Sequence, residues 1–150
     1  MNIELRDRTR ESVVESFEKY RQPEIQKTLP MRDRTLEEKL SDFEKSKNSF
    51  GKTIWVDDKY IGDVWLYGID ESETPEAMLS FCIFEKDFRG KGIMTEAVSL
   101  FLEKCPLSCV GAFAYADNAA SLKVLQKNGF EVRETFAEDG KASVYLQRNI

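Results

Sequence analysis

The sequence predicts an α/β protein that forms one domain of residues 1–150. A chain of 150 residues is long enough for one domain with a substantial hydrophobic core. Hydrophobic residues make up 41% of the chain and charged residues 33%, a balance that is typical of soluble globular proteins. Segments with strand-like and helix-like patterns follow in the order β-α-α-β-β-β-α-β-α-β-β, which places the chain in the α/β (α+β) class.

The N-terminal segment predicts a strand followed by a helix. Residues 3–6 alternate between apolar and polar side chains, as a strand with one buried face does. Thr9 can cap a helix that continues through Gln22. The inward face of this helix is expected to carry Val13, Val14 and Phe17.

The next stretch predicts an irregular segment and a second helix. Residues 22–34 contain two prolines and are expected to be irregular. The second helix is predicted to begin after Thr35 and to end near Asn48. Thr35 can cap this helix, and Glu38, three residues later, completes a capping box.

The middle and the end of the chain predict two β-hairpins on either side of a strand and a helix. The first hairpin has strands at residues 50–56 and 60–69, joined by a turn at 57–59. The later elements cover, in order, residues 108–115 (strand), 119–128 (helix), 130–136 and 142–147 (hairpin strands). Asn118 precedes the helix as a cap, and Gly129 follows it as a C′ residue.

The most informative stretch is Leu79 to Leu102, which predicts a strand, a glycine-containing loop and a helix. Residues 79–84 are almost uniformly apolar, which indicates a buried strand. Residues 89–92 read Arg-Gly-Lys-Gly, and from Ile93 onward apolar residues recur at spacings of three and four. Such a loop directs free backbone N–H groups and the positive end of a helix at one point, so it indicates a site for an anion, usually a phosphate.

Two common nucleotide-binding loops do not fit this stretch. It lacks the G-x-x-x-x-G-K-[ST] pattern of a phosphate-binding NTPase loop. It also lacks the third glycine of the G-x-G-x-x-G dinucleotide fingerprint, because Thr95 occupies that position.

The loop and a second motif together resemble the GNAT acyltransferase superfamily. Residues 89–94, RGKGIM, resemble the R/Q-x-x-G-x-G/A loop that holds the pyrophosphate of acyl-CoA. Residues 118–130, NAASLKVLQKNGF, resemble the N-x-x-S/A…K-x-G-F signature. The combination of G-K-G-I-M-T-E-A with N-x-x-S is most similar to the branch of the ribosomal-protein N-terminal acetyltransferases. Met94 departs from the family pattern, which usually has Gly or Ala at that position.

The resemblance implies a GNAT fold, which is a mixed, mostly antiparallel central sheet of about seven strands with helices on both faces. It implies that the strands at 79–84 and 108–115 part at their ends and that the pantetheine arm of acetyl-CoA lies between them. The cofactor-binding residues that it implies are Cys82, Ile83, Phe84, Arg89, Gly90, Lys91, Gly92, Ile93, Met94, Thr95, Asn118, Ser121 and Lys123.

The resemblance also implies which residues carry the chemistry. Many GNAT enzymes have a tyrosine proton donor seven residues after the Asn of the second motif, but this chain has Leu125 there. In the branch that this chain resembles, the Ser of N-x-x-S is the candidate donor to the thiolate, which implies Ser121. Asn118 is a helix cap, a catalytic pantetheine partner, or both. The proton acceptor for the amine stays open among Glu76, Asp117 and Tyr115.

The function that the resemblance implies is an acetyl-CoA-dependent N-acetyltransferase acting on a primary amine, with a protein or peptide N-terminal amine favoured. Acetylation of a small amine (a polyamine, amino acid or antibiotic) stays open, as does an acyl-CoA-binding regulator without turnover. Residues 70–76, DESETPE, are either a solvated hairpin tip or an acidic rim that attracts the amine. Three aromatic residues are expected in the core rather than in an acceptor cleft: Trp55, Trp65 and Tyr67.

Charge and residue usage narrow the chemistry further. A net charge of −5 argues against nucleic-acid binding, which needs a basic surface. The absence of histidine excludes His-based triads. Three cysteines without a CxxC pattern indicate neither a disulfide framework nor a zinc site, so no metal is expected. The apolar runs are too short for a membrane span and the start lacks a secretion-signal pattern, so we expect a cytoplasmic protein. The resemblance to the superfamily implies a monomer or a homodimer.

Overall fold

The computed structural model describes residues 1–28, 34–45 and 50–149 of the chain. Its elements are, in order, β1 Ile3–Asp7, α1 Arg10–Lys19, α2 Pro23–Thr28, α3 Leu36–Lys45, β2 Gly51–Val56, β3 Lys59–Tyr67, β4 Ala77–Ile83, α4 Ile93–Glu103, β5 Cys109–Tyr115, α5 Ala119–Lys127, β6 Glu131–Glu138 and β7 Lys141–Asn149. A short 3₁₀ turn, Lys86–Phe88, lies between β4 and α4. Within the described residues, every helix is too short or too polar to span a bilayer.

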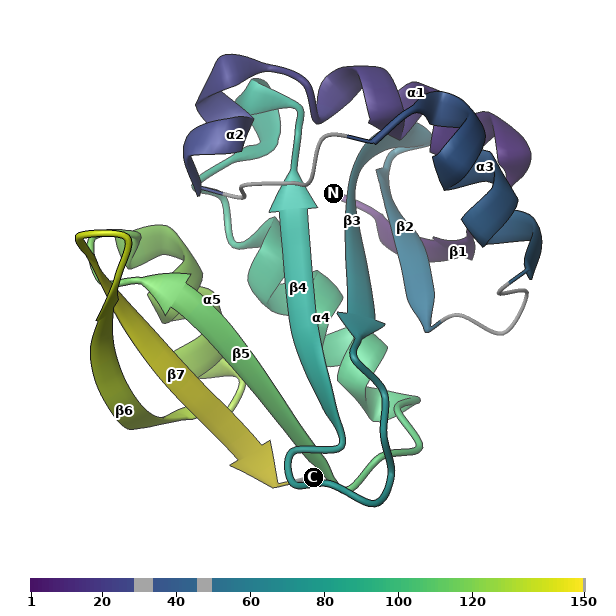
Figure 1. Ribbon diagram of the computed structural model, residues 1–150. Helices are drawn as coiled ribbons and strands as arrows, with labels where there is room; N and C mark the ends of the chain where they lie inside the picture. Colours follow the sequence, from purple (N-terminus) through teal and green to yellow (C-terminus); the bar gives the residue numbers. More distant parts are fainter. Residues whose placement is uncertain (29–33, 46–49, 150) are drawn as a thin grey trace.

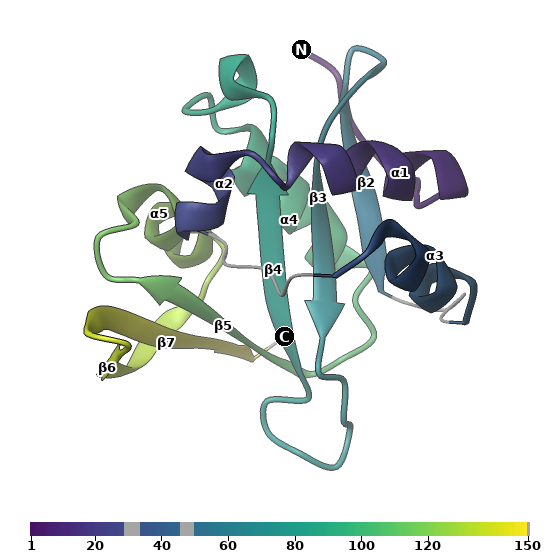
Figure 2. The same ribbon diagram turned by 45° about the horizontal axis from the view of Figure 1, so that its top comes forward.

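In the described part of the chain, seven strands form one mixed sheet in the order β1-β2-β3-β4-β5-β7-β6 (Figure 1). Neighbouring strands run antiparallel except β4 and β5, which run parallel. Helices α1, α2 and α3 lie on one face of the sheet, and α4 and α5 lie on the other (Figures 1 and 2). The predicted fold class is therefore confirmed, with α2 as one additional short helix.

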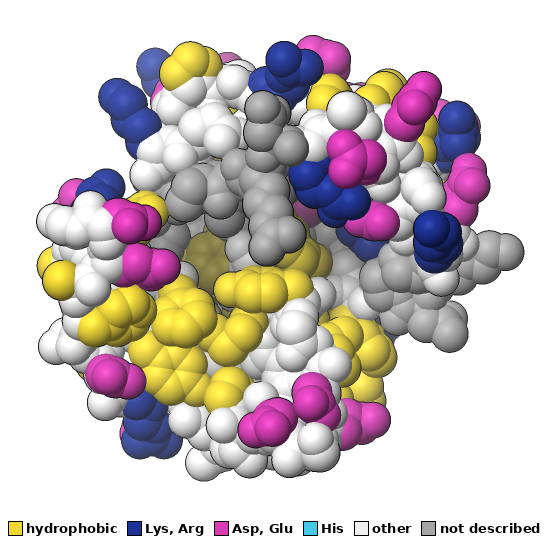
Figure 3. Space-filling view, viewed as in Figure 1, with side chains coloured by type: hydrophobic (Ala, Val, Ile, Leu, Met, Phe, Trp, Pro, Cys, Tyr) yellow, Lys and Arg dark blue, Asp and Glu magenta, His cyan; other side chains and the backbone are white. Residues whose placement is uncertain are grey.

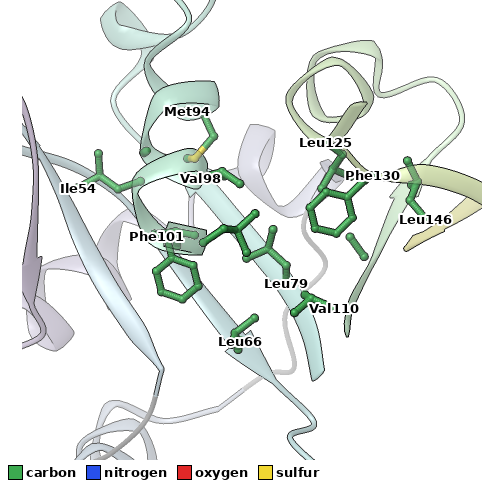
Figure 4. Packing of buried hydrophobic residues seen from close by; sticks show 14 of the residues in the cluster. Ile54, Leu66, Leu79, Met94, Val98, Phe101, Val110, Leu125, Phe130 and Leu146 are labelled. Carbon is green, nitrogen blue, oxygen red and sulfur yellow. The ribbon is translucent and has the colours of Figure 1, made fainter. Parts of the chain in front are cut away.

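The main hydrophobic core lies between the sheet and helices α4 and α5 (Figure 4). Alternate residues of the strands point into it, because successive side chains of a strand lie on opposite faces. The strands contribute Ile54, Val64, Leu66, Leu79, Val110 and Leu146, and α4 contributes Met94, Ala97, Val98 and Phe101. Burying each such aliphatic or aromatic side chain stabilises the fold by about 1.5–3 kcal/mol. This packing fixes the start of α4, and with it the glycine loop that precedes the helix.

A smaller aromatic cluster lies on the opposite face, where α1 and α2 meet the sheet. Ile25 of α2 is buried there with Tyr60 and Phe84, and Tyr20 and Cys82 pack against them. The rings of Tyr60 and Phe84 meet edge to face, with centroids 4.9 Å apart. This cluster attaches α2 to the C-terminal end of β4.

The predicted caps of the two N-terminal helices, Thr9 and Thr35, are present. The Ser12 N–H donates to Thr9 Oγ1 at 3.1 Å, and the Glu38 N–H donates to Thr35 Oγ1 at 3.1 Å. The predicted end of the second helix, near Asn48, lies outside the described residues.

Three expectations about individual segments were wrong. Residues 23–28 form α2 instead of an irregular segment, because Pro23 occupies the first helical position, where its missing N–H costs no hydrogen bond. Val14 is 40% exposed, since the inner face of α1 is set by Ser12, which is buried. Tyr67 is 44% exposed at the end of β3 instead of lying in the core.

Candidate active site

Strands β4 and β5 pair only at their beginnings and then part. Pairing is confined to Ala77–Met78 of β4 and Val110–Gly111 of β5, although the strands continue to Ile83 and Tyr115. Figure 1 shows the two strands diverging toward their C-terminal ends. The opening, called the parted-strand cleft below, has a volume of about 480 Å³ and is lined by both strands, α4 and α5. The separation of the two strands is as predicted.

The edge of β4 that faces this cleft presents the backbone groups of Phe81 and Ile83. The Phe84 N–H donates to Ile61 O of β3 at 3.0 Å. Backbone groups of successive residues point to opposite edges of a strand, so those of Ile83 and Phe81 point away from β3. An extended ligand with amide groups can pair with such an edge like an added strand.

The loop before α4 has the geometry of an anion site. Gly90 and Gly92 have φ angles of 73° and 77°, a region that favours glycine. A methyl group at either position would meet no atom within 4 Å, so the space in front of the loop is open. Gly92 is the N-cap and provides no side chain, so the N–H groups of Ile93 to Thr95 have no partner within the helix. Free amides and the positive helix end fit the diphosphate of coenzyme A.

Arg89 connects β4 to α2 at this cleft. Its Nε donates to Ile83 O at 3.0 Å, and its Nη1 lies 3.6 Å from Glu24 Oε1. The guanidinium is therefore oriented by the protein rather than free in solvent, and its charge lies beside the glycine loop.

Helix α5 provides polar groups on the other side of the cleft. Asn118 Oδ1 accepts a hydrogen bond from the Ser121 N–H at 3.2 Å, which confirms the predicted cap. Within the described residues, Asn118 Nδ2 has no partner, so this amide group can donate to a ligand. Ser121 is half-buried beside it, whereas Leu125 is buried in the core at 1% exposure and offers no hydroxyl.

The parted-strand cleft brings together most of the predicted binding residues. It is lined by Cys82, Ile83, Arg89, Gly90, Gly92, Ile93, Met94, Thr95, Asn118, Ser121 and Lys123. The side chain of Met94 is 6% exposed and packs in the core (Figure 4), so this departure from the family pattern does not narrow the loop.

Two of the predicted binding residues are not among those that line the cleft. Phe84 is 2% exposed in the aromatic cluster, and its N–H is already bonded to β3. Lys91 is exposed on the loop, and only its glycine neighbours line the cleft.

The three residues considered as proton acceptors do not line the cleft either. Glu76 precedes β4, at the end opposite Ile83, and its Oε1 accepts from the Ser108 N–H at 2.8 Å and the Ser108 hydroxyl at 2.7 Å. These hydrogen bonds lower the pKa of Glu76. The acidic segment 70–76 is at this same end, which favours a solvated tip over a rim around the amine. Asp117 and Tyr115 both contact Lys141 instead.

A buried carboxylate that the sequence interpretation missed lies one strand away from the cleft. Asp63 on β3 is 7% exposed and lies opposite Cys82 in the register with β4. The hydroxyl of Tyr60 donates to Asp63 Oδ1 at 2.5 Å, and the hydroxyl of Tyr20 donates to Oδ2. Burial raises the pKa of Asp63 to about 6, although both tyrosine hydrogen bonds act to lower it. The signal in the sequence is a single acid inside the otherwise apolar run IGDVW.

Asp63 faces a second opening, called the α1–α3 cleft below, which has a volume of about 850 Å³ between α1, α3 and β3. Tyr20 and Tyr60 line it and also belong to the aromatic cluster that contains Ile25 and Cys82. Because Ile25 and Cys82 line the parted-strand cleft, one layer of side chains separates the two clefts.

Comparison with known protein families identifies the class of this protein. The sequence model of the acetyltransferase (GNAT) domain matches residues 2–131. The chain therefore belongs to the GNAT acetyltransferase family, and the predicted enzyme class is confirmed at the level of the family.

Individual relatives agree with this assignment. The probable N-acetyltransferase YjcK of Bacillus subtilis (strain 168) is 35% identical over 85 residues, which are 54% of this chain and 46% of that protein. The match thus spans about half the length of this curated relative. RimL, the ribosomal L7/L12 α-N-protein acetyltransferase, solved with coenzyme A, has a TM-score of 0.81 at 18% identity, covering 100% of this chain and 95% of that chain.

The aminoglycoside acetyltransferase AAC(6')-Ib, also solved with coenzyme A, has a TM-score of 0.75 at 18% identity and covers 99% of this chain and 95% of that chain. At such identities these structures show the fold that the chain shares.

Proposed function

We propose that this protein is an acetyl-CoA-dependent N-acetyltransferase that transfers an acetyl group to a primary amine. The observation that carries the proposal is the parted-strand cleft, which has free helix amides at one end and an unpaired strand edge along its side. Membership of the GNAT family supports it, as do the coenzyme A complexes of RimL and AAC(6')-Ib.

In this proposal the backbone binds the cofactor and α5 assists the chemistry. The amides of residues 93–95 receive the diphosphate, and Arg89 and Lys123 add positive charge beside it. The backbone groups of Phe81 and the N–H of Ile83 are available to the pantetheine arm, since Ile83 O already accepts from Arg89 Nε. An N–H on this edge polarises the thioester carbonyl. Asn118 orients the arm through Nδ2, and Ser121 gives its proton to the leaving thiolate.

Asp63 is the proton acceptor that we propose for the amine, through Tyr20 or a water molecule. Its raised pKa leaves the carboxylate ionised at neutral pH but more basic than an exposed aspartate. An α-amine has a reference pKa of about 8 and a lysine amine about 10.4, so an α-amine needs less assistance. We therefore propose a peptide or protein N-terminal amine as the acceptor class. A cytoplasmic location and a monomeric or homodimeric state remain predictions.

Calorimetric titration with acetyl-CoA tests the cofactor site. The wild-type protein should bind acetyl-CoA, and Arg89→Glu should weaken binding by tenfold or more, on the order of 1.4 kcal/mol. The reason is that the new carboxylate would lie beside the diphosphate and beside Glu24.

Lys104→Glu is the matched control, because it makes the same charge change at the opposite end of α4, outside the parted-strand cleft. Thermal unfolding should show that both variants are folded. The cofactor site is refuted by a wild-type protein that gives no heat with acetyl-CoA, or by an Arg89→Glu variant that binds as tightly as Lys104→Glu does.

A further inference from the structure

The α1–α3 cleft has a carboxylate at its floor and basic side chains on its walls. Asp63 lies at the floor between the hydroxyls of Tyr20 and Tyr60. Four basic residues line the cleft: Arg8, Arg21, Arg34 and Lys39. Within the described residues, the only acids that line it are Asp42 and Asp63. In Figure 3 basic and acidic side chains are interspersed over α3, whereas hydrophobic side chains gather over β4, β5 and β7.

The basic residues differ in how far the protein already neutralises them. Arg34 is paired, because its Nη1 lies 2.5 Å from Asp42 Oδ2 and its Nε lies 3.8 Å from Glu38 Oε2. Arg21 instead lies over the ring of Phe17, 5.4 Å from the centroid. In the part of the chain that the structure describes, neither Arg21 nor Lys39 forms an ion pair, although the charge of Asp42 acts on Lys39.

Lys39 lies among both basic and acidic side chains in the cleft. Its side chain is half-buried, and burial lowers its pKa, followed by the positive charge of Arg34 and then of Arg8, against a rise caused by Asp42. The charge of Arg8 also acts to lower the pKa of Asp63. Burial is thus the main cause of the lowered pKa, and an anion bound beside Lys39 would favour its charged form.

The floor of this cleft is close to the predicted place of the thioester. Asp63 lies directly opposite Cys82 on β4, and neighbouring strands are about 4.8 Å apart. An amine that reaches Asp63 or its tyrosines is therefore about one strand spacing from the edge at which acetyl-CoA is proposed to bind.

We propose that the α1–α3 cleft takes an acceptor whose primary amine lies a few bonds from a carboxylate, with the amine toward Asp63 and the carboxylate toward Lys39 and Arg21. This inference rests on the proposed function. The shared chemistry is found in a free acidic amino acid and in a peptide whose first residues are acidic. Polyamines and other polycations are disfavoured, because the lining adds repulsion and leaves Lys39 and Arg21 unpaired.

Steady-state acetyl transfer by the full chain at saturating acetyl-CoA tests the inference. The acceptors are a peptide beginning Ser-Glu-Glu, its Ser-Gln-Gln and Ser-Lys-Lys counterparts, free glutamate, and spermidine. At least one of the two acidic acceptors should have a kcat/KM about tenfold above that of the Ser-Gln-Gln peptide. If the Ser-Glu-Glu peptide has the higher kcat/KM, the acceptor is a peptide; if glutamate has the higher value, the acceptor is a free amino acid.

Three variants identify the origin of the preference. Lys39→Gln and Arg21→Gln should each reduce the ratio of acidic to neutral kcat/KM toward one, mainly through a higher KM for the acidic acceptor. Lys45→Gln removes an exposed charge from the same helix, α3, outside the cleft, and should keep the wild-type ratio.

Calorimetry separates failure of the inference from failure of the proposed function. Equal or faster acetyl transfer to the neutral or basic acceptors would overturn the proposed preference for an acidic acceptor. The same holds if Lys39→Gln and Arg21→Gln leave the ratio of acidic to neutral kcat/KM unchanged. In both cases the proposed acetyltransferase activity itself stands. If acetyl-CoA binds but none of these acceptors is acetylated, the Ser-Glu-Glu peptide and glutamate are titrated into the coenzyme A complex, and lack of binding by both overturns the inference. If acetyl-CoA does not bind, the proposed function fails and the inference fails with it.

Discussion

Replacing Asp63 by asparagine should change how the stability of the protein depends on pH. Burial raises the pKa of the folded carboxyl to about 6, from an ordinary value of 3.8 that applies to the unfolded chain. Between these pH values the folded state keeps a proton that the unfolded state has lost. The free energy of unfolding therefore falls as the pH rises through this window. At 1.36 kcal/mol per pKa unit, the full effect above the folded pKa is about 3 kcal/mol.

The variant Asp63→Asn isolates this effect. Asparagine has nearly the same size and can exchange hydrogen bonds with both tyrosine hydroxyls, but it carries no charge at any pH. The assay is urea unfolding of both proteins at a series of pH values from about 3 to 8. The wild-type free energy of unfolding, minus that of the variant, should decrease by about 3 kcal/mol over this range. Asp139→Asn, at an exposed position of the β6–β7 turn, is the control for removing a carboxylate.

The reasoning is refuted if the difference in free energy of unfolding between wild type and Asp63→Asn stays constant with pH. Asp63 would then have the same pKa in the folded and unfolded states. Tyr20→Phe adds an independent test of the cause. The hydrogen bond from Tyr20 lowers the folded-state pKa of Asp63, so its removal should extend the upper end of the pH window to higher pH.

Two further predictions concern the cofactor site. Gly92→Ala should cost about 1–2 kcal/mol of stability because its φ angle is positive, and should also weaken acetyl-CoA binding because the methyl group enters the space in front of the loop. Gly140→Ala, in the β6–β7 turn with a φ angle of 75°, carries the same strain away from the cleft, and equal acetyl-CoA affinities in the two variants would contradict the loop assignment. Ser121→Ala should lower kcat by a larger factor than it raises the Kd for coenzyme A, and an unaffected kcat would remove Ser121 from the proton transfer.

The glycine loop and the two helix caps could be recognised without coordinates because each depends on neighbouring residues. Gly90 and Gly92 take positive φ angles within a span of three residues, and Thr9 caps its helix through a residue three positions away. Interactions of this kind leave a short pattern in the chain, which explains why the predicted order of elements agreed with the structure except for the additional helix α2.

The exposure of individual side chains was predicted less well. Val14 was expected to be buried from the spacing of apolar residues, yet α1 turns Ser12 inward and Val14 outward. The orientation of a short surface helix depends on what it packs against, and in this protein that includes α3 and the aromatic residues of β3. A pattern within one helix does not contain this information.

Local sequence is thus sufficient to predict the strand–loop–helix unit that is proposed to bind a diphosphate. The geometry of this unit comes from glycine conformations and from unpaired amides at the start of a helix. The buried carboxylate and the charges around it became visible only in the folded chain. Tyr20 and Asp63 are 43 positions apart, and they meet because α1 packs across β3. Lys39 reaches the same cleft on a third element. Sheet register and helix packing bring such residues together, and neither leaves a signature in the sequence around any one of them.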